Sequence, residues 1–256
     1  PRCAAMEAEA KLVMKRLGLR AVEGRLPPHA PGAVYSGEAH GLAVDLVTYG
    51  KCRTTGVDNV GTAGAVLVTA AAAQALEPDL FISAGTAGGF ARRGGAVGDV
   101  YLCAAFANHD RRIAIPGFDK YGVGRVDTGG AAGVEAVGEA ARALGLKQGV
   151  VTTGNSLDCL ERDMEMIEAN GADVKDMEAA AVAWTASWFG VPVLGVKAVT
   201  DIVDGDKPSH DEFLENLGAA CKALEVAVPR VLEHLAGSES LRLALLEPRG
   251  AETGSS

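Results

Sequence analysis

Residues 175–208 read KDMEAAAVAWTASWFGVPVLGVKAVTDIVDGDKP, and this stretch decides the fold class. The run Ala179–Phe189 is almost entirely apolar and alanine-rich, which predicts a helix. Gly190 ends that helix, and Pro192 cannot continue it. The β-branched run Val193–Val199 predicts a short strand covered on both faces, as in the sheet of an α/β protein. A helix, a tight turn and a buried strand in this order indicate the α/β class.

Two carboxylates of this stretch stand at the ends of its predicted elements. Glu178 lies at the start of the helix, and Asp201 follows the strand. Open α/β sheets bind ligands just outside the carboxyl ends of their strands, so both side chains could line one pocket. Their spacing also fits a plainer interpretation, in which Glu178 only complements the helix dipole and Asp201 is an ordinary loop residue.

Polar or glycine-rich loops are predicted after two further strands. Leu80–Ala84 runs into Gly85–Gly89, and Gly149–Thr153 runs into Gly154–Asp158. Together with Thr200–Lys207, these loops predict a single cleft along one sheet edge. The glycine segment is expected to be a turn, either structural or ligand-binding. It lacks the G-x-G-x-x-G spacing, so a dinucleotide site is not expected.

The remaining pattern alternates helices and strands along the chain. Further strands are expected at 3–5, 34–36, 42–48, 97–105 and 172–175, and further helices at 11–19, 62–76, 133–144, 164–169 and 213–235. A hairpin turn is expected at 37–41 and a long irregular segment at 107–128. Residues 1–236 are predicted to form one domain whose first strand is clipped. Residues 237–256, rich in Ser, Gly, Glu and Pro, are expected to be a disordered tail.

Composition narrows the possible partners and cofactors. The 256 residues are 48% hydrophobic and 22% charged, as in an ordinary globular protein. The net charge of −9 argues against nucleic-acid and anionic membrane partners, and no apolar run is long enough to span a membrane. The five histidines have no paired spacing, so neither a metal nor another cofactor is expected. The five scattered cysteines predict free thiols and a cytoplasmic location, although the chain starts at Pro1 and leaves an earlier targeting segment open.

Several motifs, taken in chain order, resemble one known family. They are AMEAEA at 5–10, AGTAGG at 84–89, DMEA at 176–179 and VTD at 199–201, with HDRRI at 109–113 and KAVTDIVDGDKP at 197–208 typical of its plant-type branch. The family is the 5′-methylthioadenosine/S-adenosylhomocysteine nucleosidases, and the resemblance covers roughly residues 1–235. It implies the nucleoside phosphorylase-like fold: three α/β/α layers around a mixed, partly barrel-like sheet. It also implies a homodimer that needs no cofactor.

The resemblance implies roles for the acidic residues and their neighbours. Asp201 matches the acid that protonates N7 of the adenine leaving group, and Glu178 the carboxylate that binds the ribose hydroxyls. Glu9 matches the group that positions and deprotonates the attacking water. Met177 would pack under the sugar, and Thr86 would lie close to the water or the ribose.

Further positions follow from the same resemblance. Leu157 and Asp158 match the purine pocket, and Lys197 and Thr200 match residues that support the catalytic acid. Spacing alone leaves a second interpretation of Lys197, as a lysine that reaches solvent from a strand edge. A neighbouring subunit would lend residues 113–118 to the alkylthio pocket, with Ile113, Ile115 and Phe118 as apolar walls.

The expected chemistry is cleavage of an N-glycosidic bond, which forms a cationic ribose and an electron-rich adenine. Phosphate-dependent relatives hold phosphate with arginines, but this chain has Glu7 and Glu9 in its first loop and Ser83 where an arginine would stand. A carboxylate repels phosphate by about 1–4 kcal/mol at surface-like dielectric. We therefore expect hydrolysis of 5′-methylthioadenosine to adenine and the thioribose, in methionine salvage, with S-adenosylhomocysteine as an open second substrate. A phosphorylase and an inactive storage or binding protein of the same fold are the alternatives.

Four residues call for separate expectations. Asn155 stands where the family commonly has Asp, which removes one charge near the purine loop. His109 is expected to be a hydrogen-bonded loop histidine. Trp184 and Trp188, at i and i+4 on one helix face, are expected to make core or dimer contacts.

Overall fold

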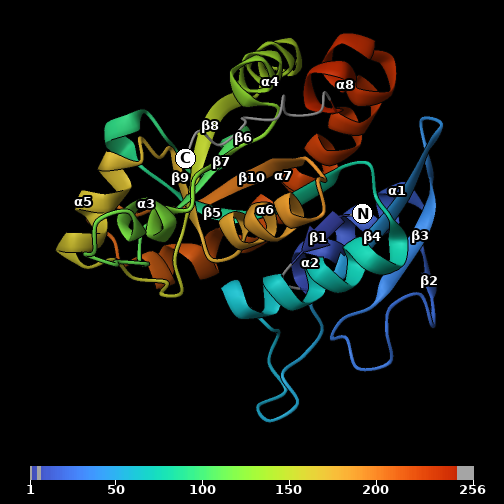
Figure 1. Ribbon diagram of the computed structural model, residues 1–256, viewed down its shortest axis with the longest axis horizontal. Coiled ribbons are helices and arrows are strands. Elements are labelled where there is room, and N and C mark those ends of the chain that lie inside the picture. The colour runs from blue at the N-terminus through green and yellow to red at the C-terminus, as the bar shows by residue number, and fades with distance from the viewer. Residues whose placement is uncertain (1, 5–6, 247–256) are drawn as a thin grey trace.

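The computed structural model describes residues 2–4 and 7–246, which form a three-layer α/β/α structure (Figure 1). Its centre is a ten-stranded mixed sheet in the order β10-β6-β8-β9-β5-β1-β4-β3-β2, with β7 (Val126–Asp127) paired to β6. The three-layer class predicted from the sequence is confirmed.

Part of this sheet closes into a barrel, because β10 pairs with β5 as well as with β6. The closed strands are β5 (Phe81–Gly89), β6 (Val100–Asn108), β8 (Lys147–Thr153), β9 (Val174–Asp176) and β10 (Val193–Ile202). The β10–β5, β6–β8 and β8–β9 pairs are parallel, whereas β10–β6 and β5–β9 are antiparallel. The closure brings the carboxyl ends of β5 and β10 side by side.

The rest of the sheet extends from β5. The short strand β1 (Arg2–Ala4) lies parallel to both β5 and β4 (Leu42–Thr48). Antiparallel strands β3 (Val34–Ala39) and β2 (Arg20–Val22) complete the edge. The hairpin between β3 and β4 is tighter than predicted: its turn is only His40 and Gly41, with φ values of 54° and 76°.

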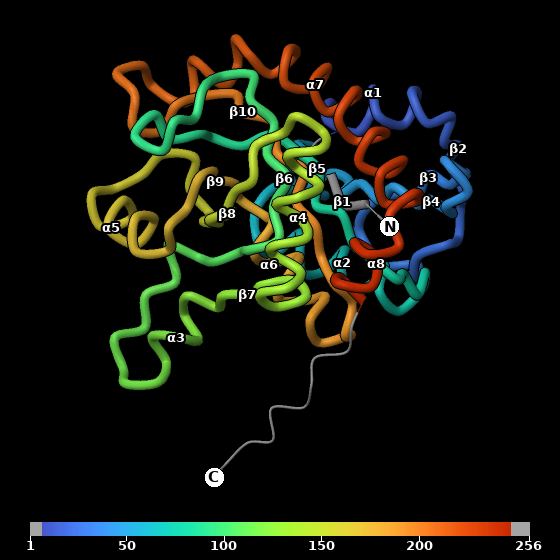
Figure 2. Tube along the Cα trace, turned by 90° about the horizontal axis from the view of Figure 1, so that it is seen from above, coloured from blue at the N-terminus to red at the C-terminus, as the bar shows by residue number. Residues whose placement is uncertain are grey.

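Helices cover both faces of the sheet. One layer contains α1 (Glu7–Leu17), α4 (Gly130–Leu144), α7 (Ser209–Gly237) and α8 (Glu239–Leu246), and the other contains α2 (Thr62–Leu76) and α6 (Ala179–Trp188). Figure 2 shows α7 running along the sheet with α1 beside it. Each layer seals one of two large apolar clusters against the strands. No helix of residues 7–246 has the length and apolar character that a membrane crossing requires.

Helix α8 lies within the expected disordered tail. Leu241 and Leu245 are buried in the same apolar cluster as residues of α4, and the Leu241 amide donates to Ser238 Oγ at 3.2 Å. The low-complexity composition of the region hid these two apolar positions. Gly237 ends α7, and residues 247–256 lie outside the described part of the chain.

Two strands continue further than their sequence patterns suggested. Gly85–Gly89 is the carboxyl half of β5, not a turn, and it pairs with β10 and β9. A Cβ at Gly88 would lie 2.5 Å from Val203 Cγ2 and 3.0 Å from Asp201 Oδ2, so close packing explains the glycine there. Asp201 itself lies within β10, one residue before its end.

The segment 107–128, expected to be irregular, contains regular structure. It includes the end of β6, the short helix α3 (Phe118–Val123) and β7. Two further elements complete the fold: a 3₁₀ turn at Ala91–Arg93 and α5 (Glu161–Ala169). The loop 154–160 between β8 and α5 borders a surface hollow that adjoins the candidate active site.

Candidate active site

A cavity of about 310 Å³ opens at the ends of β5, β9 and β10. It is lined by Glu9, Val60, Thr86, Ala87, Gly88, Leu157, Lys175, Asp176, Met177, Glu178, Thr200, Asp201, Val203 and Phe213. A larger, more open hollow of about 740 Å³ adjoins it and shares Leu157 and Val203. The smaller cavity contains the chemistry, because the three carboxylates singled out in the sequence meet there.

Glu9 reaches this cavity from the first turn of α1. Its side chain is buried, and Oε1 accepts hydrogen bonds from the Thr86 backbone N–H and from Thr86 Oγ1, both at 2.7 Å. Strand β1 lies beside β5, where Thr86 stands, and the chain passes from β1 towards α1. The short first strand is therefore enough to bring Glu9 against β5.

Glu178 lies at the start of α6 and is half-buried at the cavity wall. Its Oε1 accepts a hydrogen bond of 2.7 Å from the Gly61 N–H, just before α2. Burial, and next the negative charge of Asp176, raise the pKa of Glu178 to about 7. This carboxylate therefore changes its charge near neutral pH.

Asp201 is buried at the end of β10. Thr200 Oγ1 lies 2.8 Å from its Oδ1 and 3.2 Å from the Ala87 carbonyl oxygen. Burial raises the pKa of Asp201, although hydrogen bonds from Thr200 and Ser209 oppose the shift. A carboxyl group in this state holds a proton more readily than an exposed aspartate, as a general acid must.

Lys197 contacts a different carboxylate from the one that the resemblance implied. Its Nζ lies 2.8 Å from Asp176 Oδ2 and donates to Ser83 Oγ at 3.1 Å. Only 3% of the side chain is exposed, so this lysine does not extend into solvent. Lys197 thus supports Asp176, and the nearest support of Asp201 comes from Thr200 and Ser209.

The two predicted purine-pocket residues occupy different hollows. Leu157 lines the cavity, whereas Asp158 lines only the adjoining hollow. Lys175 Nζ donates to the carbonyl oxygens of Ser156 and Leu157, at 2.7 and 2.8 Å. This buried lysine therefore holds the loop in place.

The segment predicted to serve a neighbouring subunit does not line the cavity of its own chain. Ile115 and Phe118 are 57% and 54% exposed, and Ile113 lines a separate surface hollow. Met177, predicted to pack under the sugar, does line the cavity. Trp188 is also exposed, and its ring packs edge-to-face on Trp184 with centroids 5.8 Å apart.

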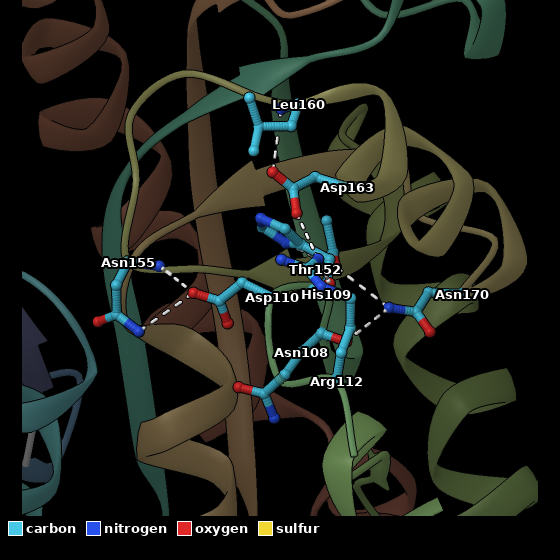
Figure 3. Close-up of polar contacts among 9 residues, drawn as sticks. All are labelled: Asn108, His109, Asp110, Arg112, Thr152, Asn155, Leu160, Asp163 and Asn170. Carbon is cyan, nitrogen blue, oxygen red and sulfur yellow. Dashed lines mark hydrogen bonds and ion pairs between the residues drawn. The ribbon is translucent and has the colours of Figure 1, made fainter. Parts of the chain in front are cut away.

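His109 lies among hydrogen-bonded residues of the loops that follow β6 and β8 (Figure 3). The ring is buried, with Nδ1 3.2 Å from Thr152 Oγ1, so the expected hydrogen-bonded loop histidine is confirmed. Burial, and next the charge of Lys175, lower the pKa of His109 to about 4. A Cβ on Gly154 would lie 2.2 Å from His109 Nε2, so only glycine fits beside the ring.

Asn155 joins three segments of this region. Its backbone N–H and its Nδ2 donate to Asp110 Oδ2, at 2.7 and 3.3 Å (Figure 3). Its Oδ1 accepts from the Thr62 N–H and Thr62 Oγ1, at 3.0 and 2.9 Å. An aspartate here would place its carboxylate against that of Asp110, which explains the neutral residue.

Sequence reasoning missed several residues that line the cavity: Val60, Ala87, Gly88, Lys175, Asp176, Val203 and Phe213. Asp176 and Lys175 carried a usable signal, because charged residues in a short buried strand require partners or a function. The others are small or apolar and look like ordinary core residues in the sequence.

The charges of the cavity do not suit a phosphate ion. None of the described residues that line it is an arginine, and its lysine, Lys175, donates to the carbonyl oxygens of Ser156 and Leu157. The nearby Lys197 is paired with Asp176. Residues 2–4 and 7–246 also contain no group of three or more His, Cys, Asp or Glu side chains placed to hold a metal ion. The site instead offers carboxylates to a cation and to a leaving group that needs a proton.

A closed mixed barrel between helical layers, with carboxylates at its strand ends, is the architecture of the phosphorylase superfamily, whose family model matches residues 3–233. Among curated proteins, an Arabidopsis thaliana 5′-methylthioadenosine/S-adenosylhomocysteine nucleosidase is 43% identical over 234 residues, covering 91% of this chain and 90% of the relative. The solved apo structure of an Arabidopsis thaliana 5′-methylthioadenosine nucleosidase superposes with a TM-score of 0.87 at 41% identity, covering 94% of this chain and 97% of that one. The chain belongs to the 5′-methylthioadenosine/S-adenosylhomocysteine nucleosidase family, as its motifs predicted.

More distant members share the fold. A Neisseria meningitidis 5′-methylthioadenosine/S-adenosylhomocysteine nucleosidase, solved in complex with methylthio-immucillin-A, has a TM-score of 0.73 at 24% identity. It covers 91% of this chain and 97% of its own. At this distance the likeness concerns the fold alone.

Proposed function

We propose that this protein hydrolyses the N-glycosidic bond of 5′-methylthioadenosine, releasing adenine and the thioribose. One observation carries the proposal: Glu9, Glu178 and Asp201, from three distant parts of the chain, line one cavity of about 310 Å³. Family membership supports the substrate class, because Arabidopsis thaliana relatives at 43% and 42% identity are named for this nucleoside.

The three carboxylates divide the reaction between them. Water adds to C1′ of the ribose while the C1′–N9 bond breaks and its electron pair moves to adenine. Asp201, whose pKa is raised by burial, gives its proton to N7 of the leaving base. Glu9, held by two bonds from Thr86, orients the water and accepts its proton. Glu178 binds the ribose hydroxyls, and the negative charges stabilise the cationic sugar of the transition state.

Water fits the cavity as nucleophile better than phosphate does. Glu9 is placed to hold the nucleophile, the described lining contains no arginine, and its lysine, Lys175, is bonded to the carbonyl oxygens of Ser156 and Leu157. The purified protein should release adenine from 5′-methylthioadenosine at the same rate with and without added phosphate. Release that requires phosphate would establish a phosphorylase, and adenine binding without any turnover would establish a binding protein.

Replacement of the acid tests the central role. Asp201→Asn should lower kcat by about 10²–10⁴-fold, because the amide cannot give a proton to the base. Asp206→Asn is the matched control, since Asp206 is exposed and lines only the adjoining hollow. Adenine release at the wild-type rate by Asp201→Asn would remove this residue as the acid.

We also propose a homodimer in which segment 113–118 completes the alkylthio pocket of the partner. The exposed apolar side chains of Ile115 and Phe118 support this arrangement. S-adenosylhomocysteine shares the adenosine and the thioether, and we propose it as a second substrate. Turnover of the two nucleosides, compared directly, tests that choice.

A cytoplasmic place in methionine salvage is the setting we propose for this reaction. Cys52, Cys103, Cys159 and Cys221 are free thiols, which suits a reducing compartment. The thioribose product retains the methylthio group, so an enzyme that uses this sugar must follow. Localisation of the full-length tagged protein in its own cells checks the compartment.

A further inference from the structure

A buried ion pair lies close to Glu178, and its carboxylate lines the cavity. It joins Asp176, the last residue of β9, to Lys197 in the middle of β10, with 2.8 Å between Oδ2 and Nζ. Both side chains are at least 97% buried, Asp176 at 1% and Lys197 at 3% exposure. A buried pair of this kind is costly to desolvate and weak evidence for a purely stabilising role.

Asp176 uses both oxygens to hold the start of α6. Oδ1 accepts from Thr153 Oγ1 at 2.5 Å and from the Glu178 N–H at 3.3 Å, and Oδ2 accepts from the Ala179 N–H at 2.9 Å. Thr153 Oγ1 in turn accepts from the Ala180 N–H at 2.9 Å. These bonds determine the direction in which the backbone leaves β9, and so where Glu178 faces.

Four groups act on the charge of Glu178. Asp176 on β9 and Glu9 on α1 oppose its ionisation, whereas Lys197 on β10 and the Gly61 N–H favour it. Asp176 has the largest effect of the charged groups. Lys197 stays a charged ammonium, because Asp176, Glu178 and Glu9 outweigh the effect of burial and raise its pKa.

We propose that Asp176 is a positioning residue of this site, which anchors the first turn of α6 to aim Glu178 into the cavity and, with Lys197, sets the electrostatic field in which Glu178 ionises. Asp176 contacts Glu178 through the backbone N–H, and although Asp176 lines the cavity, only 1% of its side chain is exposed. The inference rests on the proposed function for its catalytic consequence, but the ionisation of Glu178 can be measured without turnover.

The test compares two variants with the wild-type protein. Asp176→Asn removes the charge, and the Asp176→Asn/Lys197→Met double variant removes both charges and leaves no unpaired buried ion. In both variants the amide can bond Thr153 Oγ1 and accept from the Ala179 N–H, but its Nδ2 cannot accept from the Glu178 N–H, so the turn loses its anchor at Glu178 itself. The plateau of kcat/KM should fall by about tenfold to a hundredfold, because Glu178 is less well aimed.

The pH dependence of kcat/KM distinguishes an electrostatic effect of Asp176 on Glu178 from a purely structural role of Asp176. The wild-type limb of kcat/KM should rise near pH 7, as Glu178 ionises. The midpoint of this limb should shift furthest to lower pH in Asp176→Asn. The midpoint of the double variant should lie between those of Asp176→Asn and wild type, because the loss of the Lys197 charge partly offsets the loss of the Asp176 charge.

A carboxyl ¹³C NMR titration, assigned with Glu178→Gln, should give the same order of midpoints. Asp173→Asn is the matched control: Asp173 precedes β9, pairs with Arg93 and accepts from the Val150 N–H, but does not line the cavity. Its midpoint should equal that of wild type.

Each possible outcome either supports or refutes the proposed role of Asp176. Midpoints that stay at the wild-type value in folded Asp176→Asn and in the double variant would overturn the proposal, as would a shift no larger than that of Asp173→Asn. If Asp176→Asn does not fold, the double variant decides alone, and a midpoint at or above that of wild type refutes the proposal. If the wild-type protein releases no adenine, the proposed function fails, while the NMR midpoints still test Asp176.

Discussion

Glu178 is a carboxylate placed where its charge is unfavourable. Burial disfavours the charged form of its side chain, and the nearby carboxylates of Asp176 and Glu9 disfavour it further. The Gly61 N–H and Lys197 compensate only in part, so its pKa lies near 7. A group held this way gains most when a cation forms beside it, as the ribose does when the base departs. The position therefore costs stability and favours the proposed reaction.

The same pKa shift predicts a change in stability for Glu178→Gln. Between pH 4.5 and about 7 the folded protein keeps a proton on Glu178 that the unfolded chain has lost, so the contribution of Glu178 lowers stability as pH rises through this range. Glu178→Gln has no carboxyl group to ionise, so it should have a higher Tm than wild type at pH 8. The difference should shrink towards pH 4.5 in thermal denaturation. Glu23→Gln, at an exposed position, is the control and should show no such gain.

His109 predicts a pH dependence of opposite sign. Its pKa is lowered from 6.5 to about 4, so between these values the unfolded chain binds a proton that the folded protein does not. This group therefore lowers stability as pH falls from 6.5 to 4, opposite to the contribution of Glu178 over the overlapping range. His109→Asn, whose amide can still bond Thr152 Oγ1, should gain stability relative to wild type as pH falls from 6.5 to 4 in urea denaturation. His29→Asn, at an exposed position, should show no such gain, and a constant difference between His109→Asn and wild type over this range would contradict the prediction.

At the scale of elements, the pairing of β5 with β10 assembles the candidate site. The parallel register sets Thr86 opposite Ala198 and Gly88 opposite Asp201. The register shifts between Val199 and Asp201, an irregularity next to the candidate acid. Glycines in β5 leave room for the Asp201 side chain, which a Cβ at Gly88 would approach to 3.0 Å. The glycines of β5 thus contribute to the site because they have no side chains that would collide with Asp201.

Helix α8 offers a test of how firmly its two inward-facing leucines hold it. Leu245 is 4% exposed and Leu243, on the same helix, is 56% exposed. Leu245→Ala should lower the free energy of unfolding by about 2–5 kcal/mol, because it leaves a cavity in a packed cluster. Leu243→Ala is the matched control and should change it by less than about 0.5 kcal/mol. Chemical denaturation measures both, and equal values would contradict the packing of α8.

At the scale of the whole molecule, we propose that one domain comprises the predicted residues 1–236 and also α8, which packs into the same core. Among the described residues, one sheet joins β1 through β10, and each helical layer crosses several strands. The cavity collects side chains from α1, β5, the start of α6 and β10. Loss of any of these elements should therefore remove the activity.

The proposed dimer predicts complementation between two inactive variants. One variant is Asp201→Asn, and the other is Phe118→Asp, which should spoil only the pocket that the segment lends to its partner. A heterodimer has one site with both defects and one site with neither. Co-expression and purification through two different tags should therefore restore adenine release to about half of the wild-type rate per dimer. Homodimers of each variant are the controls, and no recovery in a verified heterodimer would contradict the shared site.

Many helices and strands could be predicted from local sequence patterns, because their formation depends on neighbouring residues. The bounds of α2, Thr62–Leu76, agree with the sequence prediction, and Gly190 has the positive φ of 70° expected after a helix. The carboxyl half of β5 could not be predicted in this way, since glycine has a weak strand preference and its pairing partners are over 80 residues away. Helix α8 was missed because the polar and glycine-rich residues on both sides of it dominate the composition of 237–256, and its leucines become part of a core only when α4 lies against them.

The sequence by itself determined the class, the family motifs and the residues that carry charge: Glu9, Glu178 and Asp201 stand at predicted element ends. The tertiary structure decided which charges meet. It paired Lys197 with Asp176 and left Asp201 to Thr200 and Ser209. The reason is physical: backbone preference acts over a few residues, whereas the partner of a buried charge and its pKa depend on burial and on groups brought close by strand pairing. The 175–208 stretch thus supplied the helix, the strand and the carboxylates, and tertiary packing brought Lys197 to Asp176 and Gly61 to Glu178.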